Sequence, residues 1–374
     1  MLEKRVSTVL PDFPWDTLAD ATATARAHPD GIVDLSVGTP VDATPLIVRR
    51  ALTQASDAPG YPSVWGAHDL HRAIIDYLRR RWGAGHITDR NVATAVGTKE
   101  VVGWLPSLLG LGADDLVVIP ELAYPTYEVG AVMAGAKVQR CDHPAAVDGR
   151  PSLIWINSPA NPHGAIIAPD VLRAWVDLAR QTGAVLASDE CYGEFGWDDN
   201  PRSVLDADIN GGDFANLLAV FSASKRSNMA GYRAGFIAGD DDIVQELVAV
   251  RKHLGMMVST PVQAGLAAAL RDQGHVAVQR LRYAGRRQAM MTALEAVGFR
   301  IEDSQGGLYL WATRDEPGRQ SVAWLANLGI LVAPGDFYGP SGTNFIRVAM
   351  TATDERISSA VDRLTNAALS QLDG

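Results

Sequence analysis

The sequence predicts an α/β fold in which a mostly parallel central sheet is flanked by helices. Between about residues 91 and 239, short apolar and β-branched runs alternate with helical patterns, as in chains that build parallel sheets through crossover helices. Strands buried on both faces are apolar throughout. Four runs have this character, at residues 116–120, 153–157, 184–189 and 217–222.

Helices are expected between several of these runs, and further helices alternate with short strands in the last third of the chain. The pattern over residues 169–181 has Pro169 and Asp170 at its start, both favourable in a first helical turn. One long helix is expected over residues 262–296, ended by Gly298. Beyond it, the patterns predict strands near residues 307–311 and 345–349 and helices over residues 321–328 and 353–369. These elements predict a smaller α+β unit.

The length of 374 residues exceeds what one hydrophobic core usually serves, so two domains are expected. We predict a large domain over residues 42–272. The small domain combines residues 1–41 with residues 273–374. The long helix, and no flexible tether, is expected to join them.

Composition excludes several classes of function. The formal charge of −10 and the pI of about 5.3 argue against a nucleic-acid partner, which requires a clustered basic face. Cys141 and Cys191 make neither a disulfide framework nor a zinc site. His68 and His71 lie three residues apart without an accompanying ligand set, so no metal is expected. Without a signal peptide or a long apolar stretch, the chain is expected to be cytoplasmic, with no membrane contact.

Lys225 follows the apolar run at residues 217–222 and lies among small hydroxylated residues, with Arg233 eight positions later. A nucleophilic lysine must be partly desolvated so that its amine is neutral. Nearby hydroxyls and an arginine suit a phosphate dianion. A surface lysine after a strand would give the same local pattern, so the segment alone leaves both interpretations open.

Polar residues also follow other apolar runs. Asp189 ends one run, where a carboxylate suits either a protonated ring nitrogen or the cap of the next helix. Asn161 lies in a rigid loop that contains two prolines and a glycine. Gly97 precedes a helix whose free N–H groups can bind phosphate. Because the carboxyl ends of parallel strands meet at one edge of a sheet, we expect a ligand site there.

Together these segments resemble the fold-type I, aspartate-aminotransferase-like enzymes that depend on pyridoxal 5′-phosphate (PLP). Asn161, Asp189, Lys225 and Arg233 follow one another at intervals of 28, 36 and 8 residues, as is usual in that family. The resemblance covers nearly the whole chain. It implies that the large domain binds PLP and that transamination is ping-pong, through a Schiff base on Lys225.

The resemblance implies roles for matching positions at the cofactor. Lys225 would carry PLP and move the substrate proton, and Asp189 would pair with the ring nitrogen. Tyr192 and Asn161 would bind the ring hydroxyl, and Tyr124 would stack on the ring. The catalytic set is thus Lys225, Asp189 and Tyr192. Further cofactor-binding positions, mostly for the phosphate, are Gly97, Thr98, Lys99, Ser222, Ser224 and Arg233.

At the substrate, Arg347 would bind the α-carboxylate by a bidentate pair, bordered by Gly38 and Asn161. Tyr61 matches a tyrosine that reaches a phosphate across a subunit interface, which implies a homodimer with shared sites. Amino acids and 2-oxo acids are the implied substrates.

Loop segments resemble the actinobacterial N-succinyl-L,L-diaminopimelate aminotransferases. That resemblance implies glutamate and 2-oxoglutarate as co-substrates and a place in diaminopimelate and lysine biosynthesis. The extra carboxylates of such a substrate predict further cationic or hydroxyl groups in the distal pocket, for which Arg226 and Tyr338 are hypotheses. The segments that carry the resemblance are residues 10–16, 34–40, 188–192 and 333–340.

Other functions remain open beside this one. Another aminotransferase, of the aspartate or kynurenine type, or a PLP cystathionine β-lyase would share every cofactor residue. A non-catalytic regulator on the same fold would normally add an N-terminal DNA-binding domain, which is not expected because Gly38 already belongs to the catalytic region.

Overall fold

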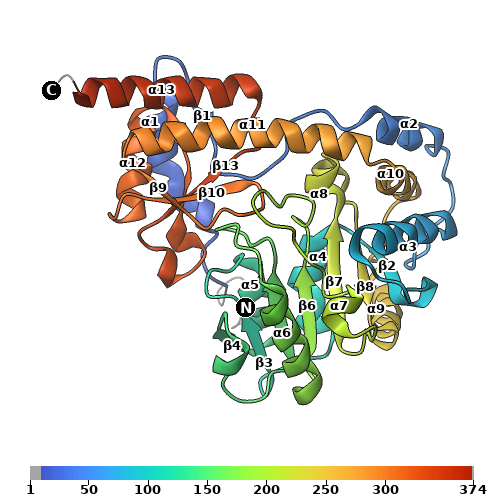
Figure 1. Cartoon of the computed structure of the whole chain (residues 1–374). Helices are drawn as coiled ribbons and strands as arrows, with labels where there is room; N and C mark the ends of the chain where they lie inside the picture. Colours follow the sequence, from blue (N-terminus) through green and yellow to red (C-terminus); the bar gives the residue numbers. More distant parts are fainter. Residues whose placement is uncertain (1–9, 373–374) are drawn as a thin grey trace, which may run out of the picture.

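A seven-stranded sheet forms the centre of the computed structural model, which describes residues 10–372 (Figure 1). Its order is β2-β8-β7-β6-β5-β3-β4. All neighbours are parallel except those of β8, which runs antiparallel to both β2 and β7. The mostly parallel sheet predicted from the sequence is confirmed. Its strands are β2 (Val92–Ala95), β3 (Leu116–Ile119), β4 (Lys137–Arg140), β5 (Leu153–Asn157), β6 (Val185–Asp189), β7 (Leu217–Ser222) and β8 (Gly235–Gly239).

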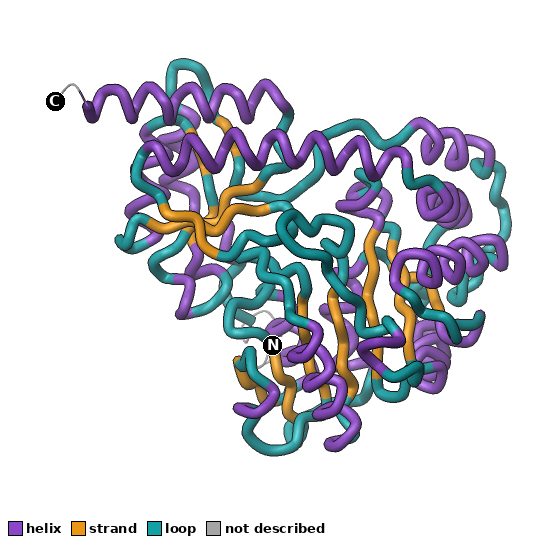
Figure 2. Tube along the Cα trace, in the orientation of Figure 1, coloured by secondary structure: helices purple, strands orange, loops and turns teal. Residues whose placement is uncertain are grey.

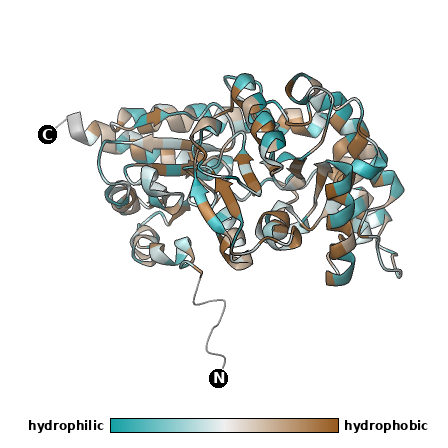
Figure 3. Cartoon of the chain, turned by 90° about the horizontal axis from the view of Figure 1, so that it is seen from below, coloured by the Kyte–Doolittle hydropathy of each residue, from teal (hydrophilic) through white to brown (hydrophobic). Residues whose placement is uncertain are grey.

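The central strands are buried on both faces, which explains their continuous apolar sequences. Along β5, Ile154 and Ile156 join the core on one face, whereas Leu153 and Trp155 join the core on the other. Figure 3 shows this pattern as apolar brown strands between helices that carry teal polar residues on their outer surfaces.

Helices cover both faces of this sheet and continue into the rest of the chain (Figure 2). Their ends follow capping rules: α6 begins at Pro169, and Gly183 ends it in the left-handed conformation. The helices are α1 (Ala19–Arg26), α2 (Leu46–Gln54), α3 (His68–Trp82), α4 (Thr98–Leu108), α5 (Thr126–Ala134), α6 (Pro169–Thr182), α7 (Ala207–Asn210), α8 (Ala223–Arg226), α9 (Asp241–Leu254), α10 (Thr260–Arg271), α11 (Gly274–Ala296), α12 (Gly318–Asn327) and α13 (Asp354–Leu372).

A second, smaller sheet has its own core (Figure 1). Its order is β12-β13-β10-β9, and every pair is antiparallel. The strands are β9 (Arg300–Glu302), β10 (Tyr309–Thr313), β12 (Ala333–Pro334) and β13 (Ile346–Ala349), and a separate parallel pair joins β1 (Val33–Asp34) to β11 (Ile330–Leu331). The predicted domain boundaries at residues 41/42 and 272/273 stay a prediction. Residues 1–9 and 373–374, which the prediction assigns to the small domain, lie outside the described part of the chain.

The single long helix expected over residues 262–296 is wrong. Two helices occupy this range, α10 and α11, because Asp272 adopts an extended backbone between them. Its carboxylate accepts hydrogen bonds from the backbone N–H groups of Gly274 (2.9 Å) and His275 (3.3 Å). An aspartate whose carboxylate accepts from the first free N–H groups of a helix is a helix-start signal, and here it outweighs the helical periodicity.

Asp42 ties the N-terminal segment to α11. Arg286 grips it with two hydrogen bonds of 2.8 Å, and Gln279 donates a third at 2.7 Å. The Arg286 side chain is only 3% exposed. Gln279 also accepts a hydrogen bond from Asn228, three residues beyond Lys225. This polar junction therefore joins three segments that border the centre of the molecule.

We expect Asp42→Asn to lower the free energy of unfolding by about 3 kcal/mol at pH 7, because it leaves a buried arginine without its bidentate partner. Burial alone would raise the pKa of Asp42, but hydrogen bonds from Arg286 and Gln279 outweigh it and hold this pKa below its ordinary value. A lowered pKa stabilises the fold above the ordinary value of about 3.9, and this contribution is lost as the pH falls through the folded-state pKa.

Urea unfolding from pH 7 down to pH 3 measures both effects, and the gap between variant and parent should shrink at the acid end. Asp354→Asn is the control, because Asp354 contacts the same arginine but is 64% exposed, and its loss should be below about 1 kcal/mol. A gap that is independent of pH would contradict this account.

Candidate active site

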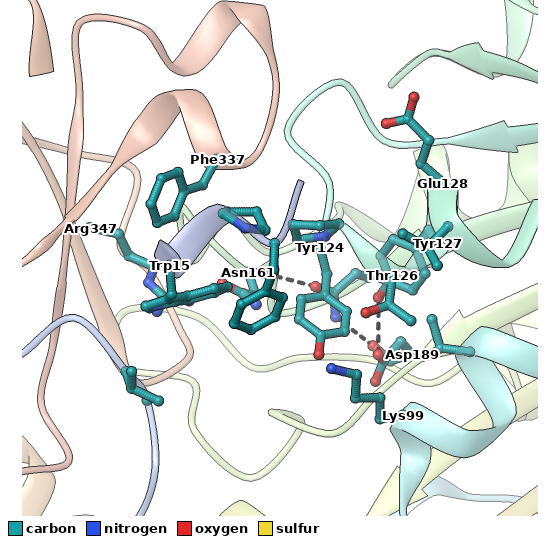
Figure 4. A pocket seen from close by; sticks show the side chains of 18 of the residues that line it. Trp15, Lys99, Tyr124, Thr126, Tyr127, Glu128, Asn161, Asp189, Phe337 and Arg347 are labelled. Carbon is teal, nitrogen blue, oxygen red and sulfur yellow. Dashed lines mark hydrogen bonds between the residues drawn. The ribbon is translucent and has the colours of Figure 1, made fainter. Parts of the chain in front are cut away.

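A cavity of about 1260 Å³ opens at the carboxyl ends of β5, β6 and β7. Its walls come from the large sheet, from β10 and β13 of the small sheet and from residues 10–17. Figure 4 shows side chains from these elements pointing into it. The position agrees with the expectation that ligands collect at this edge of a parallel sheet.

Strand register places two polar residues side by side at the floor of the cavity. Asn157 of β5 pairs with Asp189 of β6. The Asn157 amide donates to the Asp189 carbonyl (2.7 Å) and accepts from the backbone N–H of Asn161 (2.7 Å). The loop that carries Asn161 is thereby fixed to the strand ends.

Asp189 is 5% exposed, and its carboxylate has no ion-pair partner among residues 10–372. It accepts hydrogen bonds from the Tyr127 hydroxyl (2.9 Å) and from the backbone N–H of Cys191 (3.2 Å) (Figure 4). Burial raises the pKa of Asp189. A buried carboxylate with neutral donors alone favours a cationic ligand group in front of it.

Lys225 lies in the short helix α8, directly after β7. The Ser222 hydroxyl caps this helix by accepting from the backbone N–H of Ser224 (3.0 Å). The Lys225 ammonium donates to the backbone carbonyl of Gly38. Position 38 has no room for a side chain, because a Cβ there would overlap the hydroxyl of Tyr309.

The start of α4 and Arg233 form one side of the cavity. Gly97 has φ of 72°, and a Cβ at this position would overlap the guanidinium of Arg233. Thr98 and Lys99 open the helix, whose first-turn N–H groups have no intrahelical acceptors. Ser222 and Ser224, at the start of α8, line the same cavity. The start of α4, Arg233 and these hydroxyls suit an anion.

Arg347 on β13 is 2% exposed at the opposite end of the cavity. It donates to the Asn161 side chain (2.8 Å) and to the carbonyl of Ser36 (2.6 Å), whereas its Nε is buried without a partner in the described structure. The Tyr309 ring lies 4.0 Å from the guanidinium carbon. Arg347 lines the cavity without an anionic partner in the described structure, and a buried, unneutralised arginine favours a carboxylate ligand there.

Two tyrosines connect the ends of the cavity. The hydroxyls of Tyr192 and Tyr309 lie 2.8 Å apart, and both residues are buried. Burial raises the pKa of Tyr192, so its hydroxyl stays protonated at neutral pH.

Comparison with known proteins identifies this arrangement. Residues 30–364 match the family described as aminotransferase class I and II. The chain belongs to the class I and II aminotransferases. Their cofactor is PLP, and their substrates are amino acids and 2-oxo acids.

Individual relatives are similar over almost the full chain. A probable aminotransferase of Mycobacterium tuberculosis is 56% identical over 96% of this chain and 86% of its own length. The 4-dedimethylamino-4-oxo-anhydrotetracycline transaminase OxyQ of Streptomyces rimosus is 52% identical over 95% of this chain and 99% of its own length. Among solved structures, the N-succinyldiaminopimelate aminotransferase of M. tuberculosis has a TM-score of 0.83 at 26% identity, over 94% of this chain and 96% of that one.

The residues of this aminotransferase fit PLP at both ends of the cofactor. The buried Asp189 carboxylate lacks a cation that a protonated ring nitrogen would supply. The Gly97 turn, the start of α4 and Arg233 suit the phosphate. Lys225 lines the same cavity.

Most of the sequence-predicted site residues gather at this cavity. Two do not line it: Gly97 lies behind the guanidinium of Arg233, and Tyr61 is 98% exposed. Those that line it are Gly38, Thr98, Lys99, Tyr124, Asn161, Asp189, Tyr192, Ser222, Ser224, Lys225, Arg233 and Arg347.

The hypotheses for the distal pocket are wrong. Arg226 turns away from the cavity, where it is 4% exposed and forms an ion pair with Glu194 (3.0 Å). Tyr338 is fully buried behind the cavity wall, and its hydroxyl has no partner in residues 10–372. Both residues directly follow residues that line the cavity, but their own side chains pack into the protein interior.

Several cavity residues escaped the sequence analysis. Tyr127 lies one helical turn beyond Tyr124, a spacing that could have indicated it. Tyr309, Trp15, Arg140 and Arg319 carry no local signal, because only the tertiary fold brings them to the cavity.

Two further features concern metals and membranes. Within residues 10–372, the His, Cys, Asp and Glu side chains form no group that could hold a metal ion. No helix in this part of the chain has both the length and the apolar character that a membrane crossing requires.

We expect Tyr127→Phe to weaken PLP binding about 5- to 10-fold, because the Tyr127 hydroxyl stabilises the ionised form of the Asp189 carboxylate, the form that suits a protonated ring nitrogen. Titration of the apoprotein with PLP, followed by absorbance or fluorescence, measures this affinity. Tyr338→Phe removes a hydroxyl without a partner and is the matched control, with no expected change in affinity. Equal affinities for parent and Tyr127→Phe would refute the role of this hydrogen bond.

Proposed function

We propose that the cavity residues divide into a cofactor set and a substrate set. Lys225 carries PLP and moves the proton at the substrate α-carbon. Asp189 pairs with the ring nitrogen, and Tyr192 and Asn161 bind the ring hydroxyl. Tyr124 stacks on the ring. The phosphate contacts come from Gly97, Thr98, Lys99, Ser222, Ser224 and Arg233.

On the substrate side, Arg347 and the backbone of Gly38 hold the α-carboxylate. When bound, PLP supplies an electron sink for the α-carbon of the amino acid. The Lys225 amine donates to the carbonyl of Gly38, whose backbone we assign to the substrate α-carboxylate. This closeness supports Lys225 as the group that moves the α-proton. The first product leaves as a 2-oxo acid before the second 2-oxo acid binds, as a ping-pong reaction requires.

Replacing the lysine tests this assignment directly. We expect Lys225→Ala to reduce turnover more than about 1000-fold, because it removes both the covalent anchor and the proton-transfer group. The spectrum of the bound cofactor should also lose its lysine-linked absorbance. Lys252→Ala, at an exposed position of α9, is the control and should keep both. A Lys225→Ala protein with normal turnover and spectrum would overturn the assignment.

We propose that the amino donor is N-succinyl-L,L-diaminopimelate and that 2-oxoglutarate is the acceptor. The charge of the cavity carries this proposal. Among the described residues that line it, six are cationic and four are acidic, although the chain has a net charge of −10. The similarity in fold to an N-succinyldiaminopimelate aminotransferase adds support.

Arg319 is the residue we assign to a distal carboxylate of this substrate. It lies near Phe337 (5.8 Å from the guanidinium carbon to the ring centre), which contacts Trp15, and Trp15 lies beside Arg347. The two arginines thus lie at separate ends of an aromatic wall. Arg319 pairs with Asp336 (2.6 Å), but its side chain is 49% exposed. Such an exposed pair is weak, so a substrate carboxylate can replace it.

We expect Arg319→Gln to lower kcat/KM for N-succinyl-diaminopimelate about 10- to 100-fold and to leave glutamate unchanged, because only the longer substrate reaches this arginine. Arg300→Gln removes a similarly exposed arginine paired with an aspartate, away from the cavity, and is the control. Equal losses for both donors would reject the distal role of Arg319.

A donor and acceptor screen tests the substrate itself. It includes N-succinyl-diaminopimelate, aspartate, kynurenine and cystathionine, with glutamate formation as the measure of amino transfer. Release of pyruvate and ammonia from cystathionine, without amino transfer to 2-oxoglutarate from any donor, would replace this proposal by the β-lyase.

A fused-ring aromatic ketone is a second candidate substrate, as amino acceptor. Three aromatic rings line the cavity, and Trp15 contacts both of the others, Phe13 and Phe337. The Trp15 indole N–H is buried without a partner in the described structure. OxyQ, by its name, acts on such a ketone. Amination of a ketone of this class, with no turnover of N-succinyl-diaminopimelate, would favour this candidate.

We also propose a homodimer in which Tyr61 reaches the phosphate site of the partner copy. Tyr61 is 98% exposed, and Arg233 is exposed at the edge of the cavity. Tyrosine is enriched at protein interfaces, so a tyrosine this fully exposed supports one here.

A further inference from the structure

Tyr309 brings a hydroxyl of the small sheet to the centre of the cofactor site. It lies on β10, and its hydroxyl is 2.8 Å from that of Tyr192, which follows β6 of the large sheet. Tyr192 is 4% exposed and Tyr309 is 3% exposed. Their rings meet edge to face, with centres 5.6 Å apart and an interplanar angle of 69°. The contact between the two hydroxyls is therefore short and largely shielded from bulk solvent.

Neighbouring residues hold Tyr309 in place on two further sides. Its ring lies against the Arg347 guanidinium, 4.0 Å from the ring centre to the guanidinium carbon. Its hydroxyl fills the space that a Cβ of Gly38 would need. Gly38 also accepts the hydrogen bond of Lys225. Tyr309 therefore contacts two residues that we assign to the substrate carboxylate, Arg347 and Gly38, and the second of these also binds Lys225.

The number of hydrogens fixes the direction of the bond between the two hydroxyls. Each phenol has one hydrogen to donate. If Tyr192 donates its hydrogen to the ring oxygen of PLP, the hydrogen between the tyrosines must come from Tyr309. A hydroxyl that accepts a hydrogen bond becomes a stronger donor, because the bonds polarise one another.

We propose that Tyr309 is a positioning residue that donates to Tyr192 and so directs and strengthens the hydrogen bond from Tyr192 to the ring oxygen of PLP. This inference rests on the proposed role of Tyr192 and is independent of the amino donor.

The proposal has a consequence for the proton on the nitrogen that links Lys225 to PLP. Loss of this proton leaves the negative charge of the ring oxygen without its nearest positive neighbour. A hydrogen bond from Tyr192 stabilises that charge and therefore lets the proton leave at a lower pH. Removing the Tyr309 hydroxyl weakens the bond, so the pH midpoint of proton loss must rise.

Other ionisable groups face the two tyrosines and stay in place in the variants. Arg347 approaches from β13, Lys225 from α8 and Tyr283 from α11, whereas Cys191 precedes Tyr192 in the chain. Because these groups are common to all the variants, a difference between midpoints reports the hydroxyl alone.

The experiment is a pH titration of the cofactor absorbance in the PLP-loaded protein, in the absence of substrate. The variants are Tyr309→Phe, Tyr192→Phe and the double variant. We expect Tyr309→Phe to raise the midpoint by about half to one pH unit, the value of one hydrogen bond. Tyr192→Phe should raise it further, and the double variant should equal Tyr192→Phe, because Tyr309 acts through Tyr192.

Tyr338→Phe is the control, since it removes another buried phenolic hydroxyl near Arg347 that has no partner; its midpoint should equal that of the parent. A shift in Tyr192→Phe without one in Tyr309→Phe would overturn the role of Tyr309. No shift in Tyr192→Phe would overturn the assignment of Tyr192 and this inference with it. Additive shifts would show that Tyr309 acts directly, which also contradicts the proposal.

Discussion

The site depends on one buried carboxylate. Asp189 ends a strand with both faces covered, and no cation within residues 10–372 forms an ion pair with it. Burying this charge is unfavourable, and two hydrogen bonds offset part of the unfavourable free energy. One comes from the Tyr127 hydroxyl and the other from the backbone N–H that follows β6. Charge, position and direction are thus set before any ligand arrives, which is the condition for tight and selective binding of a cationic ring.

The small sheet supplies the cavity wall that the large sheet does not cover. Its strands β10 and β13 bring Tyr309 and Arg347 to the cavity, next to Tyr192 and Asn161. The polar junction around Asp42 anchors the N-terminal segment that passes between them. In the proposed assignment, the cofactor residues come from one sheet and the carboxylate-binding arginine from the other, and hydrogen bonds between Tyr192 and Tyr309 and between Asn161 and Arg347 align them.

The sequence predicted the central sheet and most of the cavity because the decisive residues follow apolar strands at fixed intervals. Strand register then brought Asn157 and Asp189 together, as parallel topology requires. Residues recruited from distant parts of the chain could not be foreseen: the partner of Tyr127 is 62 residues away, and that of Tyr309 is 117. Arg226 misled because a motif position does not fix the direction of a side chain. Asp272 broke a helix whose periodicity continued through it, because a local cap outweighed the pattern.

The contrast between the surface and the cavity has a consequence for how substrates arrive. A chain with a net charge of −10 repels anions at long range. At physiological ionic strength, salt screens this repulsion within about 8 Å, whereas the enclosed cations of the cavity stay effective. The 2-oxo acids on which this family acts are anions, so they meet an attractive field only close to the cavity. Their binding therefore depends on contacts made inside the cavity and gains little from electrostatic steering over longer distances.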